Sequence, residues 1–180
     1  MHEKDYFKCV SVLQNTMLDD NKLKVIHSHR VWTTSFVWAD PVPIKLVLDV
    51  QRQLGMNFSK DFVAFLTTVS NGAILYRDID DAMTGYEIFS TNTIFEKQER
   101  WRRSLKDLWL PQFIAIGEII SENRPIIMDT KSPAKDGQSY NLLEGSVYDP
   151  VSNWEKLSQS FHEWINQLIT AQGAQYWLWR

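Results

Sequence analysis

The sequence predicts a single α+β domain in which a small, mostly antiparallel sheet is flanked by helices. Residues 58–72 carry an apolar stripe of helical period, and a strand-like apolar run follows directly at residues 73–76. Residues 113–120 and 125–129 have the pattern of two paired strands separated by a turn. Residues 154–169 again space apolar side chains three and four apart. Helices around a run of strands, in a chain of 180 residues, favour one α+β domain.

The N-terminal part is expected to add a helix, a strand and an extended arm to this domain. Residues 3–20 show helical spacing and end in a turn rich in Asp and Asn. Residues 22–29 alternate polar and apolar side chains, which predicts a short strand. Residues 30–43 contain alternating aromatic residues but end in two prolines, which stop a regular element. We therefore divide the chain into an N-terminal part, 1–43, packed on a main domain, 44–180.

Two helices are predicted at the start of the main domain. Residues 44–54 keep the helical spacing, and Gly55 is expected to end that helix. The second helix is the one with the stripe already described. Ser59 is suited to its N-cap, and Asp61 places negative charge in its first turn, where the helix dipole favours it. We expect Asn71-Gly72 to stop this helix, because glycine adopts the left-handed conformation without steric cost.

Strands and one charged helix are predicted in the middle of the chain. Residues 73–76 and 86–89 are expected to be strands on either side of an acidic loop. Residues 91–108 are expected to form a strongly charged helix before the paired strands. After those strands, residues 140–143 and 146–148 are expected to form a last ribbon around a glycine.

The chain ends in a helix and an aromatic tail. Residues 154–169 give the helix its apolar face, Gly173 is expected to end it, and residues 176–179 contain three aromatic side chains. Aromatic residues make up 13% of the sequence, with eight tryptophans. Large flat side chains suit both cores and binding surfaces, so this excess is compatible with a binding protein.

Charge and cysteine content narrow the class of function. The net charge of −3 argues against general binding of nucleic acid, which requires a basic surface. The local basic face formed by residues 100–103 with Lys97 and Lys106 is interleaved with Glu96, Glu99 and Asp107, as is typical of a solvated helix. The single cysteine, Cys9, cannot form an intramolecular disulfide and fits a reducing compartment. With no signal-peptide core and no apolar run of about 20 residues, we expect a cytoplasmic protein that does not enter the membrane.

Signatures of catalysis are weak. The sequence has no glycine pattern of a phosphate-binding loop and no G-x-S-x-G nucleophile elbow, so we expect neither an enzyme nor a cofactor. The most tempting metal signal is His27-Ser28-His29, because residues two apart on a strand face the same way and both imidazoles could reach one ion. No third ligand can be named from the sequence. A metal-dependent enzyme is therefore the least favoured hypothesis.

The order of these elements resembles the SUKH superfamily, which includes the Smi/Knr-type regulators of fungal cell walls and many bacterial immunity proteins. The resemblance extends over residues 44 to 170. It is carried by a helix followed by Asn71-Gly72, and by four further landmarks. These are the glycine-led segment 85–88, the apolar strand 114–117 ending in glycine, the apolar strand 126–129 ending in aspartate, and the Ser-Phe pair opening residues 160–164.

The resemblance implies a protein-binding module. Many bacterial members bind a toxin, often a nuclease, and block it, so the resemblance implies the immunity partner of a toxin. A regulatory scaffold that binds a cellular protein is the alternative. An acidic patch would complement a basic nuclease through steering and charge pairing. We predict that partner-binding residues include acidic side chains and aromatic anchors on neighbouring strands. They are Asp78, Asp80, Asp81 and Glu87, with Tyr76 and Tyr86.

Overall fold

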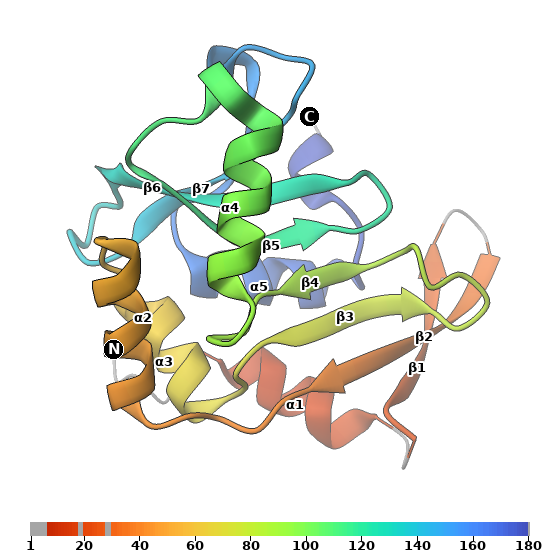
Figure 1. Cartoon of the computed structure of the whole chain (residues 1–180). Helices are drawn as coiled ribbons and strands as arrows, with labels where there is room; N and C mark the ends of the chain where they lie inside the picture. Colours follow the sequence, from red (N-terminus) through yellow and green to blue (C-terminus); the bar gives the residue numbers. More distant parts are fainter. Residues whose placement is uncertain (1–6, 18–19, 28–29, 180) are drawn as a thin grey trace.

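Each strand of the sheet pairs with the strand that follows it in sequence, and every pairing is antiparallel (Figure 1). The computed structural model describes residues 7–17, 20–27 and 30–179, and within them the sheet has eight strands. The strands are β1 (Lys22–His27), β2 (Arg30–Trp38), β3 (Ala73–Asp78), β4 (Tyr86–Ile88), β5 (Phe113–Ile119), β6 (Arg124–Pro133), β7 (Tyr140–Glu144) and β8 (Glu155–Ser158). The predicted α+β class with an antiparallel sheet is confirmed.

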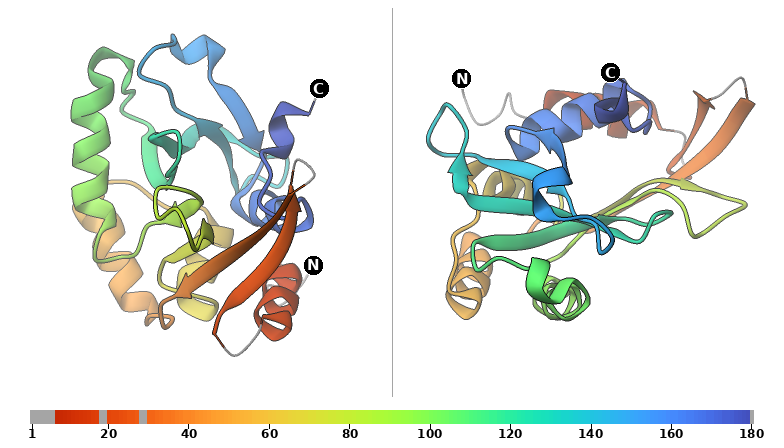
Figure 2. Two further views of the ribbon diagram at one scale, coloured as in Figure 1. Left: turned by 90° about the vertical axis from the view of Figure 1, so that its right-hand side faces the viewer. Right: turned by 90° about the horizontal axis from the view of Figure 1, so that it is seen from above.

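Helices cover both faces of this sheet. The α-helices of the described residues are α1 (Lys8–Thr16), α2 (Ile44–Leu54), α3 (Lys60–Thr68), α4 (Ile94–Leu105) and α5 (Phe161–Thr170). Short 3₁₀ helices are η2 (Lys106–Leu108), η3 (Val151–Asn153) and η4 (Tyr176–Leu178). Helix α5 packs on β7 and β8 with α1 beside it, and α4 packs on β5 from the opposite face (Figure 2).

The core on the α5 face is built from aromatic rings. Phe161 at the start of α5 lies with its ring centroid 5.0 Å from that of Phe62 and 5.1 Å from that of Phe65, both on α3. Trp164 on the next turn of α5 is fully buried. Edge-to-face contacts of this kind add about 0.5–1.5 kcal/mol per pair to the burial itself. The apolar stripes predicted for these two helices therefore meet each other.

The ends of α3 differ from the prediction. Ser59 is the N-cap residue, but its hydroxyl makes no capping hydrogen bond. The helix ends at Thr68, and Asn71-Gly72 lies beyond it. Instead, the Asn71 side-chain oxygen accepts a hydrogen bond from the backbone N–H of Thr91 at 2.9 Å, which joins the start of β3 to the segment after β4.

The N-terminal part is more regular than predicted. Helix α1 ends at Thr16, before the predicted end at residue 20, and the residues before 7 lie outside the described part. Residues 30–38 of the predicted arm form strand β2, which pairs with both β1 and β3. Thr34 and Phe36 are buried while Val37 is exposed, as expected where successive side chains of a strand point to opposite faces. The alternating aromatic residues of this segment therefore indicate a strand rather than an irregular arm.

The C-terminal prediction needs a second correction. Residues 146–148 form no strand, and β7 pairs with residues 155–158, where the spacing predicts the start of the last helix. Leu157 is a buried residue of β8, but it lies four residues before Phe161. This spacing is also that of a helix, so the sequence pattern did not distinguish the two. The start of α5 is marked by Ser160, whose side chain accepts a hydrogen bond from the Glu163 N–H.

Candidate functional site

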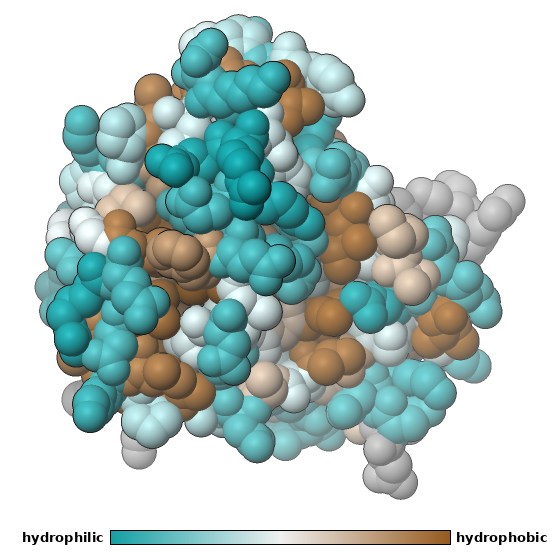
Figure 3. Space-filling view, in the orientation of Figure 1, coloured by the Kyte–Doolittle hydropathy of each residue, from teal (hydrophilic) through white to brown (hydrophobic). Residues whose placement is uncertain are grey.

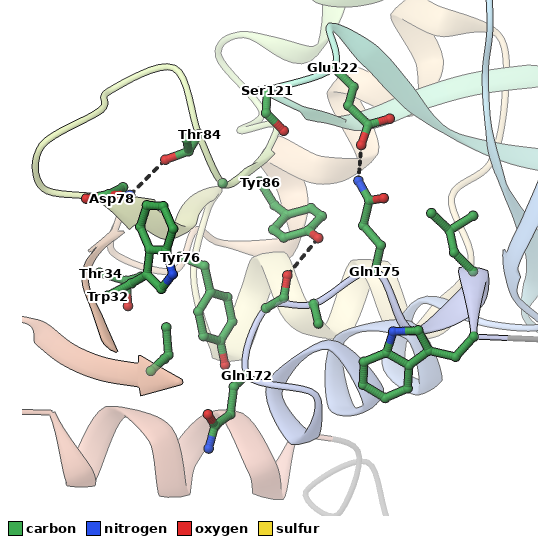
Figure 4. Close-up of a pocket in the computed structure, with 16 residues that line it drawn as sticks. Trp32, Thr34, Tyr76, Asp78, Thr84, Tyr86, Ser121, Glu122, Gln172 and Gln175 are labelled. Carbon is green, nitrogen blue, oxygen red and sulfur yellow. Dashed lines mark hydrogen bonds between the residues drawn. The ribbon is translucent and has the colours of Figure 1, made fainter. Parts of the chain in front are cut away.

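A cleft of about 480 Å³ opens where β1 and β2, the turn after β3 and the C-terminal tail meet (Figure 4). Tyr76, Asp78 and Tyr86 line it from β3 and β4. Trp32 lines it from β2, and Trp179, the residue that follows η4, lines it from the C-terminal tail. Its volume falls in the range of about 300–1,000 Å³ typical of ligand sites.

A β-bulge in β3 decides which side chains face the cleft. Between the pairs Ser35–Arg77 and Val37–Ile74, one residue of β2 opposes two residues of β3. The second of these two, Tyr76, has φ of 54°. The bulge interrupts the alternation, so that Leu75, Tyr76 and then Asp78 are buried while Arg77 is not. Without the extra residue, the alternating pattern would turn Asp78 to the other face.

The two tyrosines form the floor of the cleft. Tyr76 is 6% exposed and Tyr86 is 4% exposed. The Tyr76 hydroxyl donates to the backbone oxygen of Ile169 at 3.3 Å, and the Tyr86 hydroxyl donates to that of Gly173 at 2.9 Å. Burial raises the pKa of both hydroxyls, so they stay protonated donors at neutral pH. They therefore fasten the sheet to the end of α5.

Asp78 is a buried carboxylate without a cationic partner. It is 7% exposed, and one of its oxygens accepts a hydrogen bond from the Asp80 N–H at 3.0 Å. Within the described part of the chain, no basic side chain pairs with it and its second oxygen accepts no hydrogen bond. A buried charge is unfavourable unless it is paired, so this oxygen is a vacant acceptor on a residue that lines the cleft.

Glu122, the other acidic residue of the cleft, is already engaged. Its carboxylate accepts a hydrogen bond from the side-chain amide of Gln175, as Figure 4 shows, and lies 3.5 Å from the Arg124 Nε. The two carboxylates thus differ in their capacity to take up a new positive charge.

The remaining predicted partner-binding residues lie outside the cleft. Asp80 and Asp81 are exposed on the turn after β3, beside Asp78. Glu87 alternates with Tyr86 along β4 and faces α4, where its carboxylate lies 2.7 Å from the Lys97 Nζ. The structure therefore brings Tyr76, Asp78 and Tyr86 together and separates Glu87 from them.

Sequence reasoning missed the two tryptophans of the cleft. Trp32 is 38% exposed and Trp179 is 69% exposed, although large aromatic side chains are usually buried to a greater extent. The sequence did mark an aromatic tail and alternating aromatic residues before Pro41. Only the fold shows that these distant segments meet at one cleft.

The histidine hypothesis falls on side chains that lie outside those the structure describes. His29 lies outside them, and His27 is the last residue of β1. Among the side chains that the structure places, no three of His, Cys, Asp and Glu gather as metal ligands would. None of the helices formed by these residues has the length and apolar character that crossing a membrane requires.

One antiparallel sheet in chain order, with helices on both faces, defines an α+β protein of the kind predicted. The model of the SMI1 / KNR4 family (SUKH-1) matches residues 41–167, and the chain belongs to this family. It is also similar to the uncharacterized protein YnaB of Bacillus subtilis (strain 168). The two are 28% identical over 144 residues, which are 79% of this chain and 87% of YnaB.

The cleft is lined partly by residues within the family match and partly by residues outside it. Its floor, including Tyr76, Asp78 and Tyr86, falls within residues 41–167. Trp32 and Trp179 fall outside the matched residues, on opposite ends of the chain. The cleft therefore combines the common scaffold of the family with walls that the flanking segments add.

Proposed function

We propose that this protein is a non-enzymatic binding module that recognises a protein toxin and neutralises it as an immunity protein. Membership of the SUKH-1 family supports a binding role, because the resemblance to this superfamily implies immunity and regulatory proteins. The observation that carries the proposal is the acidic cleft, where the buried and unpaired Asp78 lies beside two exposed aspartates.

The electrostatics of this end of the molecule suit a basic partner. Asp80 and Asp81 extend the negative charge of Asp78 into solvent, where it accelerates the encounter with a positively charged surface. Toxins that cleave nucleic acids carry such surfaces, because they must hold phosphate groups. A cytoplasmic location fits this role, since the target nucleic acid is there and the free Cys9 would stay reduced.

Co-expression with candidate toxins encoded by neighbouring genes tests the proposal. We expect the protein to restore growth and to co-purify with the toxin. The double variant Asp80→Asn/Asp81→Asn should slow association, with the largest effect at low salt. The matched control is Glu96→Gln/Asp107→Asn, which removes two exposed charges on α4 and η2 and should leave association unchanged. Absence of both protection and a complex would refute the proposal for that toxin.

The alternative is a regulatory scaffold that binds a cellular protein, and a second surface favours it. Ile44, Leu46 and Leu48 on α2 and Phe95 on α4 are between 38% and 51% exposed. Figure 3 shows apolar surface between the polar side chains of these two helices, and a groove lined by Leu54, Phe95 and Trp109 lies there. A gene neighbourhood without toxin modules, together with a cellular partner whose binding is abolished by Phe95→Asp, would favour this role.

A further inference from the structure

The charges in the cleft are asymmetric. Among the described residues that line it, two are acidic and none is basic. Glu122 is held by Gln175 and Arg124, whereas no basic side chain of the described residues pairs with Asp78. The carboxylate that lacks a partner is also the more buried position, at 7% exposure, where water screens a charge least. A cation entering the cleft would therefore interact most strongly with Asp78.

The kinds of side chain around Asp78 suit a cation rather than an apolar ligand. Figure 4 shows Trp32 and Thr84 at the same end of the cleft as Asp78. A tryptophan ring face attracts a cation through its quadrupole, and this contribution adds to the charge of a nearby carboxylate. The Thr84 hydroxyl accepts from the backbone N–H of Asp78 at 2.8 Å and donates to the backbone oxygen of Asp81 at 2.8 Å. It therefore fixes the turn that holds the Asp78 carboxylate.

We infer that the cleft receives one arginine side chain from the toxin, with Asp78 as its counter-ion and Trp32 and Trp179 as the aromatic walls. This inference deepens the proposed function and rests on it for the identity of the partner. Arginine is favoured over lysine because its planar guanidinium stacks on aromatic rings and spreads its donors around a carboxylate oxygen. A volume of about 480 Å³ also leaves room for residues flanking the arginine on an exposed loop.

The inference can be tested on the isolated protein with a small probe. N-acetyl-arginine methylamide is titrated while the indole N–H resonances of Trp32 and Trp179 are followed by NMR. The matched probe is the citrulline analogue, which has nearly the same shape but no charge. We expect saturable shifts with the arginine probe at roughly millimolar concentration and at least about tenfold weaker binding of the citrulline probe. Equal binding of the two probes would overturn the inference without any variant.

The variants assign the contact to one carboxylate. Asp78→Asn keeps an oxygen that can accept from Asp80 and is expected to weaken arginine binding about tenfold or more. Asp107→Asn and Glu96→Gln each remove an exposed charge away from the cleft. Both should bind the probe within about twofold of the wild-type protein. Wild-type affinity in Asp78→Asn would contradict the inference.

The two proposals fail in different ways. If the toxin is neutralised and Asp78→Asn retains the full affinity for it, the arginine contact is wrong and the immunity role stands. If the isolated protein binds the arginine probe through Asp78 but neither protects against nor captures the toxin, the arginine site stands and the immunity role for that toxin is wrong.

Discussion

Asp61 links the first turns of α3 and α5 through a single buried carboxylate. Its side chain is 1% exposed, and one oxygen accepts from the backbone N–H of His162 at 2.9 Å and lies 3.3 Å from the Nδ1 of the same residue. The other oxygen accepts from the Phe62 N–H at 3.0 Å. Burial, the largest single influence, raises the pKa of this carboxyl, but the hydrogen bonds and charge of His162 and the neighbouring Ser59 hydroxyl together outweigh it and the pKa is lowered.

This lowered pKa predicts a pH-dependent contribution to stability. Because the folded protein holds the ionised form of Asp61, the contribution is complete above the ordinary value of 3.8 and is lost as the pH falls through it towards the folded pKa. Asp61→Asn should lower the free energy of unfolding at pH 7 by about 1–3 kcal/mol, since only one of the two oxygens remains and one buried N–H loses its acceptor. Urea unfolding at pH 7 and pH 3 checks this. A gap between wild type and variant that is the same at both values would contradict it.

Gly72 is required for two reasons that a pair of variants can separate. Its φ is +93°, and an added Cβ would lie 2.9 Å from the Ser90 backbone nitrogen. Gly55 has a φ of +66° but no atom within 4 Å of the same position. Gly55→Ala should cost about 1 kcal/mol for the left-handed backbone. Gly72→Ala should cost at least about 1 kcal/mol more, because the backbone after β4 must move. Equal losses in thermal unfolding would exclude the steric contribution.

At the scale of single elements, the sequence predicted the helices and turns that depend on interactions between residues close in the chain. Helix α2 spans Ile44–Leu54 as predicted, and Gly55 ends it in the left-handed conformation. Strands β5 and β6 pair around Asn123, whose φ of 50° suits the turn. Strand β2 is not predicted because its pairing with β1 and β3 is what makes the segment a regular strand. Strand β8 is not predicted because the spacing of Leu157 also fits a helix. Pairing with distant segments leaves no unambiguous local pattern.

The site was predictable to a similar extent. Three of the six candidates, Tyr76, Asp78 and Tyr86, line one cleft. The sequence predicted the two strands that carry the tyrosines but placed Asp78 in the loop between them, and the pairing of β3 with β4 is a finding of the structure. The bulge at Tyr76 could not be predicted, because no glycine or turn residue marks that position. The contribution of Trp32 and Trp179 depends on contacts between the two ends of the chain, which spacing does not encode.

The two serine N-caps provide an element-scale test. The Ser160 side chain accepts from the Glu163 N–H at 3.2 Å and caps α5, whereas Ser59 occupies the same place on α3 without a capping hydrogen bond. Ser160→Ala should therefore lower the free energy of unfolding by about 1 kcal/mol. Ser59→Ala should cost clearly less. Chemical denaturation of both variants checks the order, and a larger loss in Ser59→Ala would contradict the assignment of the caps.

For the molecule as a whole, the cleft exists only because the C-terminal tail returns to the sheet. The Tyr176 hydroxyl donates to the Leu157 oxygen at 3.1 Å. The Trp177 indole N–H donates to the buried carboxylate of Glu144 at 2.8 Å, and its ring lies 6.3 Å from that of Tyr86. These contacts fix the tail at the first two residues of η4. They place Trp179 opposite strands that lie far from it in sequence.

Trp177 should therefore control binding in the cleft although it does not line it. Trp177→Phe keeps most of the apolar surface but leaves one Glu144 oxygen without its donor, which should cost about 1–3 kcal/mol of stability. A loosened tail should also weaken binding of the arginine probe several-fold. The matched control is Trp154→Phe, which loses an indole hydrogen bond to the Asp149 oxygen at 3.1 Å away from the cleft. It should lower stability while leaving probe affinity unchanged. If NMR titration shows the same affinity in both variants, the tail does not shape the cleft as its contacts imply.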